Sequence, residues 1–270
     1  PGADLSIPMY PMNFVLPDGR VLSVGTSDIP TGVITRVLDI NTQTWSTVDP
    51  IAIDGPTAVM YLPGQVMKPS ANTYVLDMSQ PSPSWQQTAP MNKPRTLYTN
   101  VTLLPDGNVL AIGGENSAGT PIFEAEVWSP VTKQWTLLAP MQIERLYHST
   151  TLLLPDGRIL VAGGRGNAPA SEQYNAQIYS PPYLFQGARP TIISAPTLVQ
   201  YGTTFQVSTP DAASISKVTF IRLGAVTHSF NMDQRFLDLS FTQGSGTLDI
   251  QAPANGNLAP PGYYMLFILN

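Results

Sequence analysis

The sequence predicts an all-β protein in which a partial β-propeller of about four blades precedes an Ig-like β-sandwich. Two observations carry this prediction: one segment recurs along the first part of the chain, and the repeat stops near Arg189. The 270 residues include 27 prolines and 21 glycines, which is typical of many short strands joined by turns. We therefore expect propeller blades over residues 1–187 and the sandwich over residues 188–270.

The repeat is clearest in two copies. The stretch "APMNKPRTLYTNVTLLPDGNVLAIGG" from Ala89 aligns without a gap with "APMQIERLYHSTTLLLPDGRILVAGG" from Ala139. Each copy has an apolar run, a Pro-Asp-Gly turn and a second apolar run, the pattern of a β-hairpin. A third strand is expected at "EVWSP" and "QIYSP", and a fourth near a tryptophan that precedes the next copy. Three of the four tryptophans, Trp45, Trp85 and Trp135, take this position. Four strands per unit predict a propeller blade.

Two further copies lie closer to the N-terminus. "YPMNFVLPDGRVLSVG" begins at Tyr10, and a degenerate copy, "AVMYLPGQVMK", runs from Ala58 to Lys68. The copies are roughly 40 to 50 residues apart, as in kelch-type propellers. Because four blades do not close a ring comfortably, we expect this chain to be a portion of a longer protein. Missing blades would then come from the same or another chain.

The sequence changes character after "SPPYLFQGARP". Short apolar segments, "TFQVSTP", "KVTFIRL", "FLDLSF" and "GTLDIQAP", are separated there by clusters of turn residues. This pattern predicts a small β-sandwich. The chain stops at "YYMLFILN", inside an expected strand, so we expect the sandwich to be truncated.

Composition excludes several classes of function. The net charge of -5 gives no electrostatic reason to bind nucleic acid or an anionic membrane. The chain has no cysteine, so it cannot build a disulfide framework, a thiolate nucleophile or a cysteine-based zinc site. No stretch has the pattern of a signal peptide or a membrane span. The low charge content and the lack of free thiols are compatible with an extracellular, secreted or cell-surface location.

One of the two histidines, His148, follows Tyr147 at the start of an expected strand. The preceding copy has Leu97 and Tyr98 at these positions, and Tyr10 takes the histidine position in the first copy, so the blade itself does not require an imidazole there. Neighbouring residues of a regular strand point to opposite faces. Both side chains can therefore reach one metal ion only where the strand starts and the backbone turns. Packing remains an alternative.

The other histidine, His228, lies in "RLGAVTHSFNMDQRF" between two strands of the expected sandwich. This segment could form a hairpin that reaches out of the sandwich. An ordinary half-buried histidine is the alternative.

Five stretches occur in order along the chain: "RLYHSTTLLLPDGRILVAGG", "NAQIYSPPYLF", "ARPTI", "RLGAVTHSFNMDQRF" and "APPGYYMLFILN". Together they resemble the last blades and the C-terminal domain of the galactose oxidase and glyoxal oxidase family of copper radical oxidases. The resemblance is strongest from about Ala89 to Asn270. It implies copper as the cofactor, with Tyr147, His148 and His228 as its ligands.

The resemblance also implies that Tyr147 is the base for the proton of the substrate hydroxyl. Imidazole nitrogen and phenolate oxygen suit Cu(II), whereas two histidines without cysteine make a closed structural zinc site hard to assemble. In the family, hydrogen abstraction belongs to a different tyrosine, which is cross-linked to a cysteine in an earlier blade. No cysteine is present here, and Tyr10, Tyr61 and Tyr98 occupy later-blade positions. We therefore expect the chain alone to be inactive.

Other candidates are weaker. The segment Pro121–Phe123 resembles one that lines the substrate mouth in the family, although a plain blade loop explains it as well. Asn100 begins a glycosylation sequon inside an apolar strand pattern, where we expect it to be silent. Glu124 and Glu126 are two residues apart on an expected strand, so they should share a face, which we expect to be solvent. They do not form a glycosidase-like pair.

These observations lead to two functional hypotheses. The first is part of a secreted copper radical oxidase that converts a primary alcohol, aldehyde or carbohydrate with O2 and releases H2O2. The second is a non-catalytic extracellular propeller protein that binds glycans or has a structural role.

Overall fold

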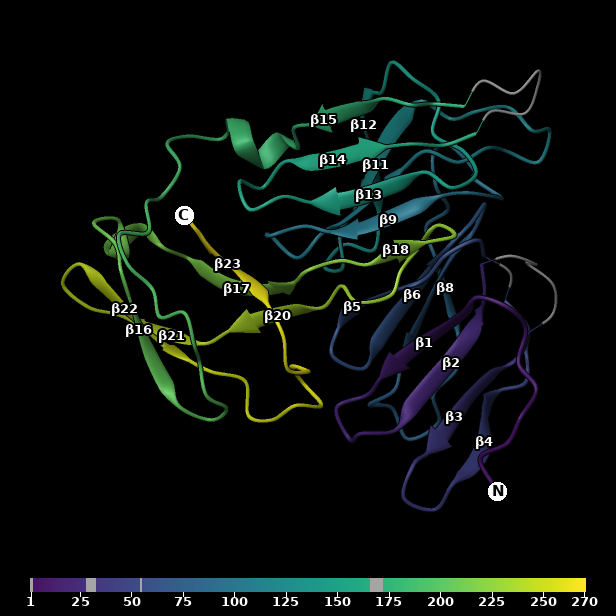
Figure 1. Ribbon diagram of the computed structural model, residues 1–270, viewed down its shortest axis with the longest axis horizontal. Helices are drawn as coiled ribbons and strands as arrows, with labels where there is room; N and C mark the ends of the chain where they lie inside the picture. The colour runs from purple at the N-terminus through teal and green to yellow at the C-terminus, as the bar shows by residue number, and fades with distance from the viewer. Residues whose placement is uncertain (1, 28–32, 54, 166–171) are drawn as a thin grey trace.

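The computed structural model describes residues 2–27, 33–53, 55–165 and 172–270. Within these ranges the chain is all-β apart from two short 3-10 helices, Pro182–Phe185 (η1) and Ala212–Ser214 (η2). Four antiparallel sheets follow one another in the first part of the chain, and two further sheets and a hairpin form the C-terminal part (Figure 1). In the ranges described, no helix is long and apolar enough to cross a membrane.

The first three sheets each contain four strands in sequential order, as expected for the repeat. The bounds of their strands are β1 Pro11–Val15, β2 Val21–Thr26, β3 Thr35–Asp39, β4 Thr44–Asp49, β5 Val59–Leu62, β6 Gln65–Pro69, β7 Thr73–Asp77, β8 Gln86–Thr88, β9 Asn100–Leu103, β10 Val109–Ile112, β11 Glu124–Trp128 and β12 Trp135–Pro140.

The fourth sheet differs from the expected four strands per unit. It contains three strands in the described part of the chain: β13 Thr150–Leu153, β14 Ile159–Ala162 and β15 Ala176–Tyr179. After β15 the chain enters η1 and leaves for the C-terminal part. No tryptophan follows this copy in the way that Trp135 follows β11, so the local signal for a fourth strand is also missing from the sequence.

The Pro-Asp-Gly sequence forms the same turn in three sheets. Gly19, Gly107 and Gly157 have φ of 89°, 92° and 82°, a conformation that glycine adopts without steric cost. The aspartate before each glycine accepts a hydrogen bond from the backbone N–H two residues later, at 3.0 Å in every copy. The turn is therefore fixed by local chemistry, and it places the two flanking strands side by side.

Apolar residues fill the space between neighbouring sheets, and tryptophan side chains join the sheets through hydrogen bonds. Trp85 donates its indole N–H to the Thr35 hydroxyl at 2.7 Å, and Trp135 donates to Thr73 at 2.8 Å. Each bond reaches back to the preceding sheet. The recurring tryptophan is thus both an apolar filler and a polar connection between blades.

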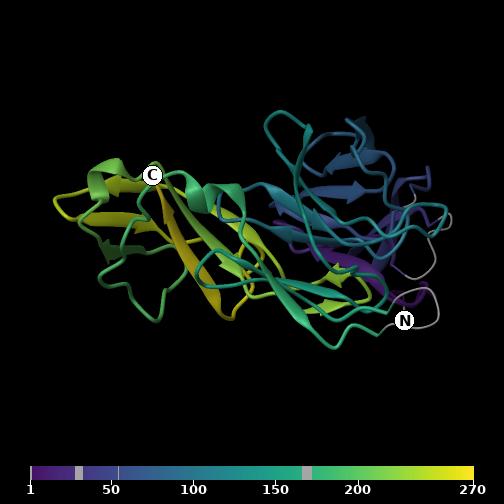
Figure 2. The same cartoon turned by 90° about the horizontal axis from the view of Figure 1, so that it is seen from above.

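The C-terminal part is a sandwich of two three-stranded sheets, in the orders β16-β22-β21 and β20-β17-β23. The strands are β16 Thr204–Ser208, β17 Lys217–Arg222, β20 Phe236–Leu239, β21 Phe241–Gln243, β22 Thr247–Gln251 and β23 Tyr264–Leu269. One apolar cluster lies between the sheets and includes the stacked rings of Phe205 and Phe220. Figure 2 shows the sandwich at one end of the molecule and the four sheets at the other.

The sandwich rests on the Pro-Asp-Gly end of the third sheet. Phe236 and Phe267 join the apolar cluster that β9 and β10 also line, and a methyl group at Gly107 would lie 3.0 Å from the Phe236 ring. Thr219 donates its hydroxyl to the Pro105 carbonyl at 3.1 Å, and Lys217 donates to the Asp106 carbonyl at 3.0 Å. These contacts fix the position of the sandwich, from which a later segment of the chain extends among the sheets.

The hairpin of β18 (Val226–Thr227) and β19 (Phe230–Asn231) leaves the sandwich and lies among the sheets, beside β9 and β13 (Figure 1). Gln234, at its base, accepts the N–H of Leu103 and donates its amide to the Val101 carbonyl, both at 2.9 Å. Further along, Phe230 contacts Phe14 edge-on. The hairpin therefore runs away from the turn end of the sheets toward the starts of their first strands.

Candidate metal centre

Tyr147 and His148 lie in a turn that precedes β13. The Ser149 N–H donates to the Leu146 carbonyl at 2.9 Å, and His148 has a φ of 61°. This left-handed conformation is uncommon for residues other than glycine. Because the backbone turns here, the two side chains do not point to opposite faces, and their rings stack with centroids 3.8 Å apart.

His228 lies at the tip of the β18–β19 hairpin. Thr227 pairs with Phe230, so His228 and Ser229 form a two-residue loop with φ of 49° and 62°. Two consecutive positive φ values define a type I′ turn, in which asparagine and glycine are the preferred residues. A histidine at this position costs conformational energy, and such cost concentrates at functional sites.

The two histidines meet although 80 residues separate them in sequence. Their Nε2 atoms lie 3.3 Å apart, and their rings are nearly perpendicular, with centroids 4.9 Å apart. The Nδ1 atom of His228 lies 2.7 Å from the Thr227 hydroxyl. When Nδ1 donates this bond, Nε2 keeps its lone pair and faces the other imidazole. The structure thus brings the two histidines together, and their role as copper ligands stays a prediction.

Aromatic rings from the other sheets surround the pair. Tyr10, which precedes β1, stacks on His228 with ring centroids 3.6 Å apart and an interplanar angle of 17°. Tyr98, which precedes β9, lies 5.4 Å from the ring of Tyr147. Tyr10 and Tyr98 have φ of 53° and 61°. In the first, third and fourth sheets, the residue at the repeat position of His148 therefore has a left-handed backbone.

The electrostatic environment favours the neutral form of the His148 imidazole. Burial and the neighbouring charge of His228 lower the pKa of His148 below its ordinary value. In the described ranges, no three His, Cys, Asp or Glu side chains gather in a way that could hold a metal ion. The nitrogen atoms that face each other are those of His148 and His228, and the ring of Tyr147 brings a phenol beside them.

This donor set fits a copper ion. A metal at roughly 2 Å from each imidazole nitrogen is compatible with the 3.3 Å between the two Nε2 atoms. Nitrogen with phenolic oxygen is a ligand set that suits Cu(II). The intermediate exposure of Tyr147 and His228 and the exposed edge of His148 leave an approach from solvent for a small substrate.

The other sequence candidates have different environments. Phe123 is exposed at 37%, and Pro121 bridges to Glu115 in the loop before β11. Asn100 is 2% exposed, and the silence of its sequon stays a prediction. Tyr61 lies in the core against Trp128, where burial and then the charge of Asp77 raise its pKa to about 12.

The expectation that Glu126 faces solvent is wrong. Its side chain is 0% exposed and forms an ion pair with Arg95, which is also fully buried. A register shift between Glu124 and Glu126 interrupts the alternation of faces, and Glu124 pairs with Lys93 at the surface instead. A bulge in β11 thus separates two residues that a regular strand would place together.

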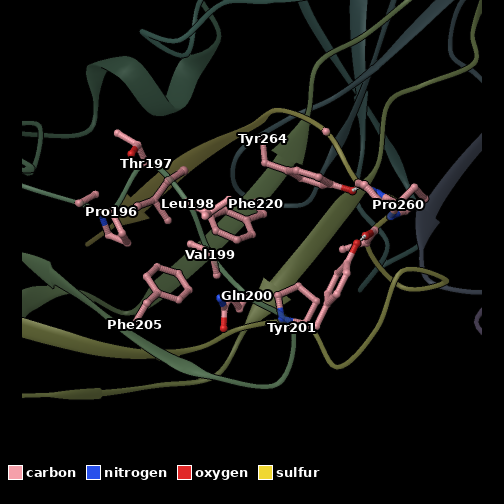
Figure 3. Close-up of a pocket in the computed structure, with 16 residues that line it drawn as sticks. Pro196, Thr197, Leu198, Val199, Gln200, Tyr201, Phe205, Phe220, Pro260 and Tyr264 are labelled. Atoms are coloured by element: carbon pink, nitrogen blue, oxygen red, sulfur yellow. Dashed lines mark hydrogen bonds between the residues drawn. The ribbon is translucent and has the colours of Figure 1, made fainter.

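The site does not coincide with the pocket in the sandwich. That pocket, of about 310 Å³, lies between residues 195–201 and β23. Figure 3 shows the rings of Tyr201, Phe205, Phe220 and Tyr264 around it. Tyr201 and Tyr264 donate their hydroxyls to backbone carbonyls, so the pocket offers few free polar groups. Its lining suits apolar contacts and contains neither histidine.

Comparison with known proteins gives matches along most of the chain. A family model described as the glyoxal oxidase N-terminus matches residues 64–183, and one described as the galactose oxidase-like early set domain matches residues 189–270. Galactose oxidase of Gibberella zeae is 34% identical over 218 residues, which is 74% of this chain and 32% of that protein. Aldehyde oxidase GLOX of Vitis pseudoreticulata is 35% identical over 107 residues, covering 35% of this chain and 20% of that protein.

A solved structure shares the fold. It is a fungal alcohol oxidase of the AA5 family in complex with copper, 24% identical, with a TM-score of 0.74 over 97% of this chain and 72% of that one. The chain spans about a third of the length of the galactose oxidase it matches.

Proposed function

Because this chain belongs to the galactose oxidase and glyoxal oxidase-like family, we propose that it carries the copper-binding part of an oxidase site for a primary alcohol or aldehyde. The observation that carries the proposal is the 3.3 Å approach of the Nε2 atoms of His148 and His228. They are the chain's two histidines, and they come from separate parts of the fold.

In this proposal, His148 and His228 hold copper through Nε2, and the phenol of Tyr147 is the third ligand from the chain. Copper supplies a Lewis acid and a centre that accepts one electron. Tyr147 accepts the proton of the substrate hydroxyl at its phenolic oxygen. The stack of Tyr147 on His148 holds the phenol beside the site.

The complete reaction removes two electrons and two protons from the alcohol, and O2 takes up both to give H2O2. Copper, when bound, would account for one electron. In the family, a tyrosine cross-linked to cysteine accounts for the other, and this chain has no cysteine. A second hypothesis, a binding or structural propeller protein without turnover, is favoured by that same observation.

Copper binding tests the proposal directly. We expect Cu(II) to bind the chain with one imidazole nitrogen coupling per histidine in the electron paramagnetic resonance spectrum. The single variants His148→Ala and His228→Ala should each lose one coupling, and the double variant should lose both. Calorimetry should show Cu(II) affinity falling by at least about tenfold for each single variant. Mutation of groups that only hydrogen-bond to metal ligands already lowers metal affinity by about tenfold or more. Equal Cu(II) affinity in the double variant and the parent would refute the metal site.

Activity is the second prediction. We expect the copper-loaded chain to give no more H2O2 than free copper with galactose, glyoxal or methylglyoxal in a peroxidase-coupled assay. The reason is the missing partner for the second electron. Turnover by this chain would contradict the argument and would point to Tyr10 or Tyr98, the tyrosines near the site, as an unlinked redox residue. Turnover in a longer chain alone would support the oxidase hypothesis over the binding hypothesis.

A further inference from the structure

We propose that Tyr10 is a positioning residue for the candidate copper site: by stacking on His228, it fixes the plane of that imidazole and the direction of its Nε2 atom. This inference rests on the proposed function, because it assigns a role toward the same site. Tyr10 is not proposed as a ligand or as a group that reacts.

The geometry of the stack is the first observation. The rings of Tyr10 and His228 are 3.6 Å apart and within 17° of parallel. The other ring neighbours of His228 meet it at steep angles, 85° for His148 and 64° for Tyr147. Tyr10 is therefore the described aromatic residue that covers a face of this imidazole. A covered face restricts rotation about the bond that joins the ring to its side chain.

The position of His228 makes such a restraint necessary. A two-residue loop at the tip of a two-stranded hairpin has little packing of its own. The side chain of His228 has one hydrogen-bonding partner within the hairpin, the Thr227 hydroxyl, at 2.7 Å from Nδ1. Outside the hairpin, the Nε2 atom of His228 lies 3.3 Å from that of His148. Both contacts lie at the edge of the ring, and the stack with Tyr10 adds a contact with its face.

The backbone at Tyr10 is the second, independent observation. Tyr10 has a φ of 53°, although it carries a Cβ and precedes Pro11, and a following proline disfavours helical conformations. Two contacts at the end of β2 hold the segment: the N–H of Ser27, which follows β2, donates to the Tyr10 carbonyl at 3.3 Å, and the hydroxyl of Thr26, its last residue, donates to the Met9 carbonyl. Strain of this kind persists where the surrounding structure imposes it. Here the left-handed backbone directs the phenol ring of Tyr10 toward His228 at the tip of the hairpin.

The site thus joins elements that are distant in sequence. Tyr10 belongs to the first sheet, His148 to the fourth, and His228 to the C-terminal hairpin. The stack links the first sheet to a ligand, so the first sheet affects the metal without contacting it. Pre-organised ligands of this type bind metal more tightly because less ordering is required on binding.

The test compares Tyr10→Phe, which keeps the ring, with Tyr10→Leu, which removes it. The exposed Tyr263→Leu, at 84% exposure in the parent, is the matched control for loss of a tyrosine. The first readout needs no metal: in the copper-free chain, ring protons of His228 should resonate upfield because of the stacked ring. We expect this shift in the parent, in Tyr10→Phe and in the control, and its loss in Tyr10→Leu.

The second readout is Cu(II) affinity by calorimetry, with the copper hyperfine pattern as its spectroscopic signature. Tyr10→Leu should bind about tenfold more weakly, the effect expected of groups that orient a ligand, with a broadened pattern. Tyr10→Phe should stay within about twofold of the parent. If Tyr10→Leu shows no thermal unfolding transition, Tyr10→Gln takes its place as the variant without a ring.

Two results would overturn the inference. One is unchanged affinity and unchanged His228 resonances in the variant without a ring. The other is loss of affinity in Tyr10→Phe, which would assign the effect to the hydroxyl. If the parent chain itself binds no Cu(II), the copper proposal fails, and the resonances still decide whether Tyr10 orients His228.

Discussion

Two buried arginines at the same position of the repeat have different partners. Arg95 and Arg145 occupy the same position in two successive copies of the repeat, and both are 0% exposed. Arg95 pairs with the buried carboxylate of Glu126. The corresponding residue in the next sheet is Gln177, whose Oε1 accepts a bond from Arg145 at 3.3 Å. Burial lowers the pKa of Arg145, and its guanidinium donates to neutral carbonyl and amide oxygens.

We expect Gln177→Glu to stabilise the chain, because it would give Arg145 the carboxylate that Arg95 already has. The matched change, Glu126→Gln, should destabilise by about 3 kcal/mol, since it leaves the buried Arg95 without a counter-charge. Urea unfolding of both variants against the parent measures the two effects. A lower unfolding midpoint for Gln177→Glu would show that the half-buried glutamate costs more in desolvation than it gains.

At the scale of elements, turns carry much of the local specificity. Asp77 ends β7, and its carboxylate accepts bonds from the Ser79 N–H, the Ser79 hydroxyl and the Gln80 amide, at 2.9, 2.7 and 3.1 Å. Burial by itself would raise the pKa of Asp77, but these bonds outweigh it, and the pKa lies below its ordinary value. The carboxylate form is therefore the one that the folded turn prefers.

This sets a pH dependence for stability. A depressed pKa in the folded state means that the contribution of Asp77 is complete above its unfolded pKa of about 3.9 and is lost as the pH falls through the folded value. The Tm of the parent should therefore exceed that of Asp77→Asn near pH 6, and the gap should close as the pH falls below about 4. Ser79→Ala, which removes one of the three bonds, should show a smaller gap. A constant gap across this range would contradict the assignment.

At the scale of the whole molecule, the sandwich is held so that its hairpin can reach the far end of the sheets. Gln234 is 6% exposed and bonds the backbone of β9 at two points. Arg235, beside it, donates to the Val15 carbonyl of the first sheet at 2.8 Å. These contacts tie the base of the hairpin to two different sheets.

We expect Gln234→Leu to lower stability by about 1–3 kcal/mol, because it leaves the backbone groups of Val101 and Leu103 buried without partners. Cu(II) affinity should fall with it, since the hairpin that carries His228 loses its anchor. Gln206→Leu is the control, because Gln206 bonds an exposed aspartate within the sandwich. Calorimetric titration and thermal unfolding check both effects, and an unchanged affinity in Gln234→Leu would mean that other contacts suffice to dock the hairpin.

The sequence by itself determined the features that depend on neighbours along the chain. The Pro-Asp-Gly turns, the repeated strands and the change of character near Arg189 follow from local turn chemistry and periodicity. They predicted the all-β class and the four successive sheets. The repeat also showed that His148 occupies a position where Tyr10 and Tyr98 occur in other copies. The burial of Glu126 was predicted wrongly, because a bulge breaks the period on which the prediction rested. In the described part of the chain the fourth sheet has three strands where the repeat predicted four.

Only the tertiary structure decided how residues far apart in sequence meet. His148 and His228 come within 3.3 Å of each other because the sandwich packs on the turn end of the sheets and directs its hairpin toward the strand starts. The stack of Tyr10 on His228 depends on the same docking and on a left-handed backbone that no propensity predicts for a tyrosine before proline. Local sequence sets turns and strands, whereas ring orientation and burial at the site depend on the packing of three separate parts of the chain.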